Sequence, residues 1–75
     1  MERKRPLGDP KALKTLGNKI ASLRKITGLS QEKLADAAGI ERSYMGTIER
    51  GERNPSYDKL VSIAKALKVS LSELV

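Results

Sequence analysis

Cysteine and histidine are both absent from this chain of 75 residues. Their absence excludes disulfides, thiol catalysis and the commonest zinc ligands. The carboxylates that remain are scattered along the chain, so no group of them suggests a tuned acid or a metal set. We therefore expect no enzymatic activity, no metal and no cofactor, and nothing in the sequence indicates a small-molecule ligand.

Long apolar runs and aromatic side chains are also scarce. No stretch approaches the ~18 apolar residues of a membrane-spanning helix, and the N-terminus lacks the hydrophobic centre of a secretory signal. We therefore expect a soluble, cytoplasmic protein without a membrane partner. Tyr44 and Tyr57 are the only aromatic residues, too few for the platform of rings on which single-stranded nucleic acid stacks.

The chain does have a surplus of positive charge. Fifteen Lys and Arg against nine Asp and Glu give a formal net charge of +6, which favours a polyanionic partner. Nucleic acid, an acidic protein and an anionic membrane all fit this sign, so the positions of the charges must decide between them. The length corresponds to one domain, near the size at which a core alone is only marginally sufficient.

The segment 31–50 predicts two short amphipathic helices separated by Gly39, a helix-turn-helix arrangement. Glycine there fits a helix end, because a left-handed residue costs glycine little. At about 100° per residue along the second helix, one side carries the apolar Ile40, Tyr44, Met45 and Ile48. The other side carries Arg42, Ser43, Gly46 and Arg50, with Thr47 at the border.

The outward side of this second helix is polar and basic, which favours duplex DNA as the partner. An ordinary helical hairpin with a solvated outer face fits the same pattern, because helix-turn-helix patterns taken alone give many false positives. The segment by itself therefore leaves both interpretations open.

The rest of the chain predicts an all-α domain over 9–75, preceded by a flexible basic arm over 1–8. The arm could follow phosphates or enter a minor groove, and a solvated tail fits it equally. Asp9 and Pro10 are typical of a helix start, and this first helix should run to about Thr27 before Gly28 stops it. Its expected apolar stripe is Leu13, Leu16, Ile20, Leu23 and Ile26.

Three more helix starts follow the same logic. Ser30 should cap a helix over 31–38, whereas Glu41 is a poorer cap for the helix over 42–50. Ser56 should cap a fourth helix, which carries Leu60, Ile63, Ala64 and Leu67 inward. Ser70 and Glu73 form a capping-box pattern for a last short helix over 71–75, so we expect five helices and no strand.

Three ordered segments carry a family resemblance over residues 16–75: LRKITGLSQEKLA, GIERSYMGTIERGERNPS and LVSIAKALKVSLSEL. They resemble the Cro and phage-repressor type of helix-turn-helix domain, also called the xenobiotic-response-element (XRE) family. The resemblance implies a compact five-helix bundle of the lambda-repressor-like DNA-binding type. In that fold the third helix enters the major groove and the N-terminus of the second abuts the DNA backbone.

The resemblance also implies site residues, matched position by position. Base or groove contacts are expected from Arg42, Ser43, Tyr44 and Thr47, and phosphate contacts from Gln31, Arg50, Arg53 and Asn54. An arginine near the start of a groove-bound helix can donate two hydrogen bonds to guanine. Gln31 stands at a helix start, where main-chain amides favour an anion.

Arg24 and Glu49 match a structural ion pair that ties the first helix to the end of the recognition helix. Two positions depart from the family pattern. Glu41 is the helix cap and could repel phosphate, and Gly46 leaves fewer side chains for readout on the face that we expect to be exposed.

These observations lead to a sequence-specific transcription regulator, similar in size and pattern to phage repressors and to small controller proteins of restriction–modification systems. We expect a homodimer with half-sites about one DNA turn apart, ~34 Å, because one short helix reads few bases. Leu71, Leu74 and Val75 are the possible dimer surface, and core packing fits them equally. The alternative is an antitoxin-like or co-regulator module that binds protein with the same fold.

Overall fold

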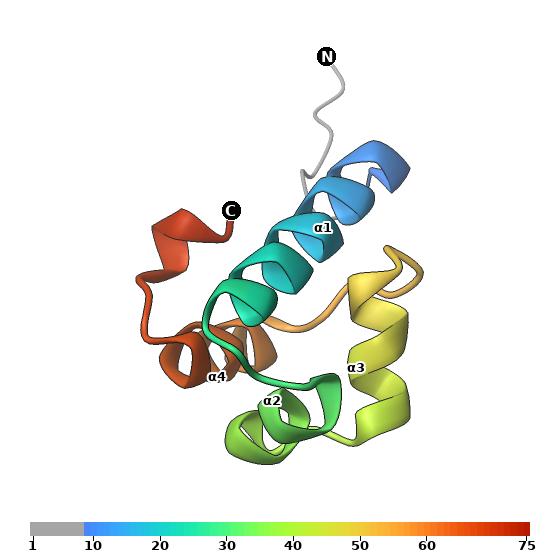
Figure 1. The fold of residues 1–75 in the computed structure, drawn as a ribbon. Helices are drawn as coiled ribbons and strands as arrows, with labels where there is room; N and C mark the ends of the chain where they lie inside the picture. Colours follow the sequence, from blue (N-terminus) through green and yellow to red (C-terminus); the bar gives the residue numbers. More distant parts are fainter. Residues whose placement is uncertain (1–8) are drawn as a thin grey trace.

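The structure, a computed structural model, describes residues 9–75; the basic arm expected over 1–8 lies outside them. Within the described part the chain forms four α-helices and a final 3-10 turn, with no strand (Figure 1): α1 (Pro10–Ile26), α2 (Gln31–Ala38), α3 (Arg42–Glu49), α4 (Tyr57–Leu67) and η2 (Leu71–Glu73). None of the helices over 9–75 is long and apolar enough to span a bilayer.

Side-chain caps start three of the four helices where the sequence predicts them. The side chains of Asp9, Ser30 and Ser56 accept hydrogen bonds from main-chain amides two or three residues later, at 3.1, 3.0 and 3.3 Å. Each bond satisfies one of the amide groups that the first helical turn leaves without a partner. The starts of α1, α2 and α4 are therefore fixed by short polar side chains close in sequence.

Gly39 makes the turn between α2 and α3. Its φ of +70° lies in the left-handed region, which costs glycine little because it has no Cβ. The Gly39 amide donates to the Asp36 carbonyl (3.2 Å) and the Ile40 amide to the Ala35 carbonyl (2.9 Å). These bonds close the end of α2 and direct the chain at once into α3, as the sequence predicts.

The core lies where α2 packs on α4, α1 packs on α3, and α2 meets α3. Its largest fully buried side chains come from all four helices: Ile20, Leu34, Met45, Ile48, Leu60, Ile63 and Leu67. The helix-turn-helix pair is therefore held from both sides, by α1 behind α3 and by α4 behind α2. Figure 1 shows α3 on one side of the bundle and the end of the chain on the opposite side.

Gly17 allows α1 and α3 to come into close contact. A Cβ atom at this position would lie 2.5 Å from the Glu49 carbonyl oxygen and 2.6 Å from that of Ile48. Because both neighbours are main-chain atoms, no side-chain rotation could make room for a larger residue. The absence of a side chain at Gly17 therefore sets how closely the C-terminal end of α3 approaches α1.

Two expectations about the elements are wrong. The fifth α-helix over 71–75 is instead the three-residue 3-10 turn η2, although the Glu73 half of the capping box is present, with the Ser70 amide donating to Glu73 Oε2 at 3.4 Å. So short a segment gains too few hydrogen bonds to offset the cost of starting an α-helix.

The apolar stripe predicted for α1 includes Ile26, but this side chain is 78% exposed. Six residues after Ile20, it is turned about 120° away from the buried face. The stripe therefore ends at the half-buried Leu23.

Candidate nucleic-acid interface

The N-terminal end of α3 presents polar side chains to solvent. Arg42 and Ser43 are exposed, whereas Met45 and Ile48 lie in the core. The predicted division of this helix into an inner apolar side and an outer polar side matches this burial. The first turn of α3 therefore carries a guanidinium and a hydroxyl on the outer surface of the bundle.

Glu41 precedes this turn and does not cap it with a side-chain hydrogen bond, in agreement with its expected weakness as a cap. Its Oε1 instead accepts from the Ser43 hydroxyl at 3.4 Å. The first turn of α3 therefore carries a carboxylate beside the guanidinium of Arg42, and its main-chain amides lack a side-chain acceptor.

Tyr44 and Thr47, the other two predicted base or groove contacts, are half-buried. The Thr47 hydroxyl donates to the Tyr44 carbonyl at 2.6 Å, so its own proton is already used within the helix. The Tyr44 ring packs against the core, with Arg53 5.8 Å and Lys59 5.7 Å from the ring centre. Lys59 stands on α4, and no motif in the sequence links it to α3.

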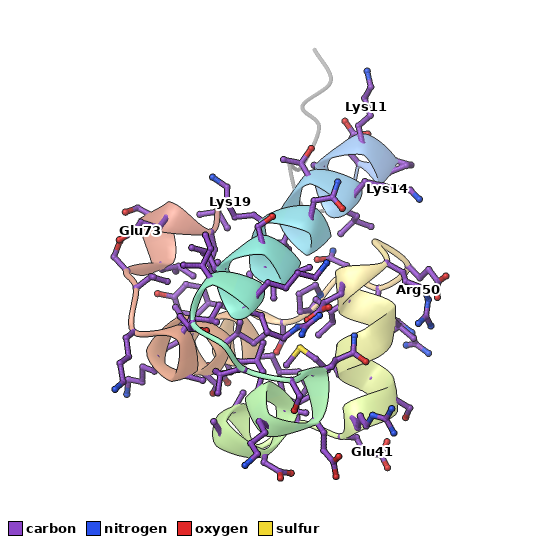
Figure 2. The ribbon with its side chains drawn as sticks, viewed as in Figure 1. Lys11, Lys14, Lys19, Glu41, Arg50 and Glu73 are labelled. Atoms are coloured by element: carbon purple, nitrogen blue, oxygen red, sulfur yellow. The ribbon has the colours of Figure 1, made fainter. Side chains whose placement is uncertain are left out.

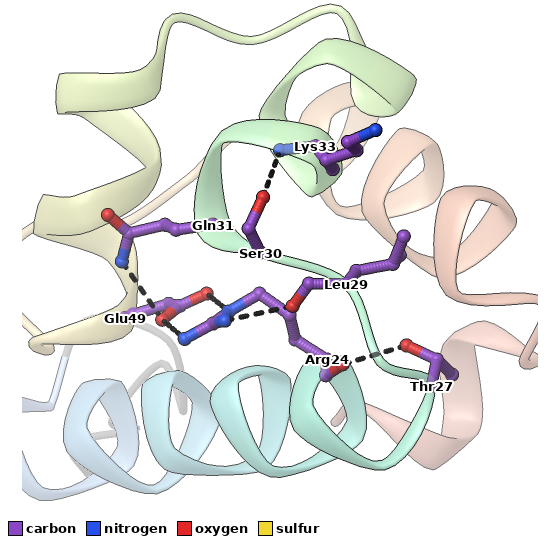
Figure 3. A network of polar contacts seen from close by, with 7 residues as sticks. All are labelled: Arg24, Thr27, Leu29, Ser30, Gln31, Lys33 and Glu49. Carbon is purple, nitrogen blue, oxygen red and sulfur yellow. Dashed lines mark hydrogen bonds and ion pairs between the residues drawn. The ribbon is translucent and has the colours of Figure 1, made fainter.

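A polar network joins α1, α2 and α3 at their ends (Figure 3). Arg24 donates to Glu49 from Nε at 2.8 Å and from Nη2 at 3.1 Å, and from Nη1 to the Leu29 carbonyl at 3.1 Å. The Arg24 and Glu49 side chains are only 14% and 6% exposed. The ion pair implied by the family resemblance is present, and it is bidentate and largely buried.

Gln31 extends this network to the start of α2. Its Nε2 donates to Glu49 Oε1 at 3.1 Å (Figure 3), a contact that sequence reasoning missed because it joins residues on different helices. An amide nitrogen carries two hydrogens, so one remains for another acceptor. The network fixes the start of α2, where main-chain amides favour an anion, relative to the end of α3.

The remaining predicted phosphate contacts, Arg50, Arg53 and Asn54, are exposed beyond the end of α3. Arg50 pairs with Glu52, from Nε at 3.1 Å and from Nη2 at 3.2 Å, and the two side chains are 60% and 55% exposed. The hydrogen bond from Arg50, with smaller contributions from the charges of Arg50 and Lys14, lowers the pKa of Glu52, and desolvation opposes this shift. Sequence reasoning gave Glu52 no role.

The sequence predicts Gly46 on the exposed face of α3, but in the structure this residue is buried. A side chain from the end of α3 and one from the start of α2 cover it, because a Cβ there would lie 3.2 Å from Arg50 Nη1 and 3.4 Å from Gln31 Oε1. It lines an open hollow of about 520 Å³ together with Gln31, Glu41, Arg42, Ser43 and Arg50. The polar face of α3 is thus concave, with an arginine at each end; Figure 2 labels Arg50 and Glu41 at the two ends of the helix.

The end of the chain, considered as a possible dimer surface, is divided between core and solvent. Leu74 is only 3% exposed and belongs to the core, Leu71 is half-buried against it, and Val75 is 67% exposed. Core packing therefore accounts for Leu74, and Val75 is the exposed apolar side chain of the three.

A family model described as helix-turn-helix matches residues 20–74, a range that contains the C-terminal part of α1 and all the later elements. The chain belongs to this helix-turn-helix family. Control protein C.SmaI from Serratia marcescens is 43% identical over 60 residues, which make up 80% of this chain and 71% of that protein.

Solved structures agree with this helix-turn-helix assignment. The restriction–modification controller protein C.AhdI from Aeromonas hydrophila gives a TM-score of 0.85 at 42% identity, over 87% of this chain and 98% of that one. SinR, a master regulator for biofilm formation solved in complex with DNA, gives a TM-score of 0.76 at 38% identity, over 79% of this chain and 95% of that one. In this helix-turn-helix protein, α2 and α3 are the two helices of the motif.

Proposed function

We propose that this protein is a sequence-specific regulator of transcription that binds duplex DNA with α3 in the major groove. The exposure of Arg42 and Ser43 at the start of α3 carries this proposal, because the apolar side of the same helix is fully used by the core. A helix so placed has a free polar face of the size that a major groove, ~12 Å wide, admits. The net charge of +6 favours the same polyanionic partner.

The exposed side chains suggest a division of labour along the face. Arg42 enters first and donates to a guanine edge, since arginine pairs with guanine O6 and N7 through two parallel hydrogen bonds. Arg53 and Asn54 lie beyond the other end of α3 and contact phosphates, as do Gln31 and Arg50 on the rims of the hollow. Phosphate contacts set the register of the helix on the duplex, and base contacts select the sequence.

The regulator acts as a homodimer on an operator with two-fold symmetry. The eight residues of α3 contact too few base pairs to define an operator alone. A second copy of the protein doubles the number of base pairs contacted. Relatives named as control proteins and as an immunity repressor, together with SinR bound to DNA, support a regulatory role. These names also agree with the expectation that the chain is not an enzyme.

A protein-interaction module is the second candidate function. The observation that favours it is the solved complex of the SinR and SinI proteins, in which a chain 38% identical to this one, with a TM-score of 0.77, is bound to another protein. Such a module should bind all duplexes equally poorly, so measurements of DNA binding separate the two functions.

The decisive experiment selects bound sequences from a random duplex library and then measures affinity against salt. A DNA-binding regulator should enrich one motif, and log K should fall steeply with log salt as counterions are released. If no motif emerges and affinity is weak at all salt concentrations, the protein-interaction module is the better explanation.

One substitution tests the assignment of the recognition face. Arg42→Ala should relax the preference at one base pair per half-site, because an arginine–guanine pair contributes about 1–3 kcal/mol of discrimination. Arg53→Ala is the matched control, since it should weaken all duplexes alike and flatten the salt slope by about one unit. An unchanged preference profile for Arg42→Ala would show that α3 is not the reading helix.

A further inference from the structure

Arg50 stands at the proposed DNA face with its guanidinium already paired. We propose that Glu52 competes with DNA phosphate for Arg50 and so lowers the affinity of the protein for duplexes of every sequence. The inference rests on the proposed function, because it concerns the same face. It assigns a role to a carboxylate that the DNA contacts themselves do not use.

The pair is short and exposed. Glu52 accepts through both oxygens, at 3.1 and 3.2 Å, and both side chains are more than half exposed. A guanidinium facing two carboxylate oxygens uses the same parallel N–H groups that would bind two phosphate oxygens. Glu52 occupies the Nε–Nη2 edge of the guanidinium, so a phosphate that binds Arg50 through this edge requires the pair with Glu52 to open.

The main chain holds Glu52 close to Arg50. The Gly51 amide donates to the Ile48 carbonyl at 3.0 Å and the Glu52 amide to the Thr47 carbonyl at 2.9 Å, so the turn after α3 is closed by two hydrogen bonds. Gly51 also packs against α1, since a Cβ there would lie 2.9 Å from Lys14 Cα. Because this turn is firmly held, the carboxylate of Glu52 stays within reach of Arg50.

Arg50 points to the place where phosphate is expected. Its Nη1 lies 3.2 Å from the position of a Cβ at Gly46, and Gln31 Oε1 lies 3.4 Å from the same point. The guanidinium therefore borders the start of α2, the site proposed for the DNA backbone. A phosphate arriving beside Gln31 meets Arg50, whose Nε–Nη2 edge becomes available only when the pair with Glu52 opens.

Lys14 gives the displaced carboxylate another partner. Lys14 stands on α1 against the turn that carries Glu52, since a Cβ at Gly51 would lie 2.9 Å from its Cα and 3.0 Å from its Cγ. Its charge also contributes, less than Arg50 does, to the lowered pKa of Glu52. On binding, Arg50 turns to phosphate while Glu52 stays near Lys14. This exchange of partners reduces the electrostatic free energy that Arg50 gains when it binds phosphate. The reduction applies to every duplex, because phosphates are present whatever the base sequence.

The test compares Glu52→Gln with the wild-type protein on the selected operator and on a random duplex. Both affinities should rise by about two- to fivefold near 0.1 M salt, which is the size expected for an exposed ion pair that is lost on binding. The slope of log K against log salt should steepen by up to about one unit, because Arg50 then meets phosphate as a cation that is not already paired with a carboxylate.

Glu73→Gln is the matched control. It removes the same charge from η2, which lies far from Arg50 in Figure 2, and glutamine still serves in a capping box. Its affinity for both duplexes should stay close to that of the wild type. If Glu73→Gln strengthens binding as much as Glu52→Gln does, overall charge explains the effect and the proposed competition is overturned.

A double-mutant cycle separates competition from simple repulsion between Glu52 and DNA. In an Arg50→Gln background, Glu52→Gln should no longer strengthen binding, because the competing pair is already absent; an effect that persists would overturn the proposal. In the free protein, Arg50→Gln should also raise the pKa of Glu52 toward its usual value, as measured by NMR titration. If the wild type binds no duplex, the proposed function fails as well, whereas equal binding by wild type and Glu52→Gln removes only this inference.

Discussion

At the scale of single residues, Glu49 is the hydrogen-bond acceptor that links three elements. Its two oxygens accept from Arg24 on α1 and from Gln31 on α2, while Glu49 itself ends α3. No other carboxylate in residues 9–75 pairs with an arginine and is so little exposed. The residue therefore contributes both to the stability of the fold and to the placement of a proposed phosphate contact.

Glu49→Ala should lower the free energy of unfolding by about 3 kcal/mol, because it leaves the charge of Arg24 largely buried and without its partner. Urea unfolding followed by circular dichroism measures the change. Glu49→Gln keeps the size of the side chain and one acceptor oxygen, so this variant should fold and lose less stability than Glu49→Ala. Glu52→Gln also separates a carboxylate from an arginine, but at the exposed surface, and should leave the midpoint almost unchanged. Equal midpoints for the Glu49 and Glu52 variants would contradict the buried network.

The residues of the candidate site differ in how well the sequence predicted their surroundings. Arg42 and Ser43 are exposed as expected, because helical periodicity alone places them opposite the core. The burial of Gly46, the bond from Gln31 to Glu49 and the pair between Arg50 and Glu52 were all missed. Each depends on the conformation of a long side chain or on contact between elements, which periodicity does not determine.

At the scale of elements, the contact between α1 and α3 is set by Gly17. A glycine inside a helix is unfavourable by about 0.5–1 kcal/mol relative to alanine, so Gly17→Ala should stabilise α1 taken alone. In the bundle the added Cβ would lie 2.5 Å from the Glu49 carbonyl oxygen. We expect the clash to dominate, with a net loss of about 1–3 kcal/mol of unfolding free energy in urea denaturation.

Gly46→Ala is the matched control for this substitution. It is also a glycine within a helix, but its added Cβ would meet only the far ends of the Arg50 and Gln31 side chains. These side chains can move, so the variant should be as stable as the wild type or slightly more stable. If Gly17→Ala were as stable as Gly46→Ala, the close approach of α1 to the end of α3 would be wrong.

Most of the elements could be predicted because their signals are local. Asp9, Ser30 and Ser56 each accept from an amide within three residues, and Gly39 ends α2 through its own φ. The end of α4 at Lys68 has no such signal, since this residue takes a φ of 61° without being glycine. The fifth helix was mispredicted because a capping pattern does not show whether enough residues follow to sustain a helix.

At the scale of the whole molecule, the bundle separates two surfaces. The proposed DNA face on α3 lies on the opposite side of Figure 1 from the end of the chain, where Val75 is exposed. A partner copy bound near the chain end would therefore leave both α3 helices free. Two-fold symmetry would then carry them to successive major grooves on one side of the duplex.

This arrangement predicts a strict dependence on the spacing between half-sites. Inserting about five base pairs at the centre of the selected operator turns one half-site to the other side of the duplex, because B-DNA repeats about every 10.5 base pairs. A rigid dimer can then engage only one half-site, so affinity should fall to that of a single half-site in a fluorescence anisotropy titration. Changing the central sequence without changing its length is the control and should have a much smaller effect. If affinity were indifferent to the insertion, each copy would bind independently, and the two-fold dimer would be ruled out while DNA reading by α3 remained.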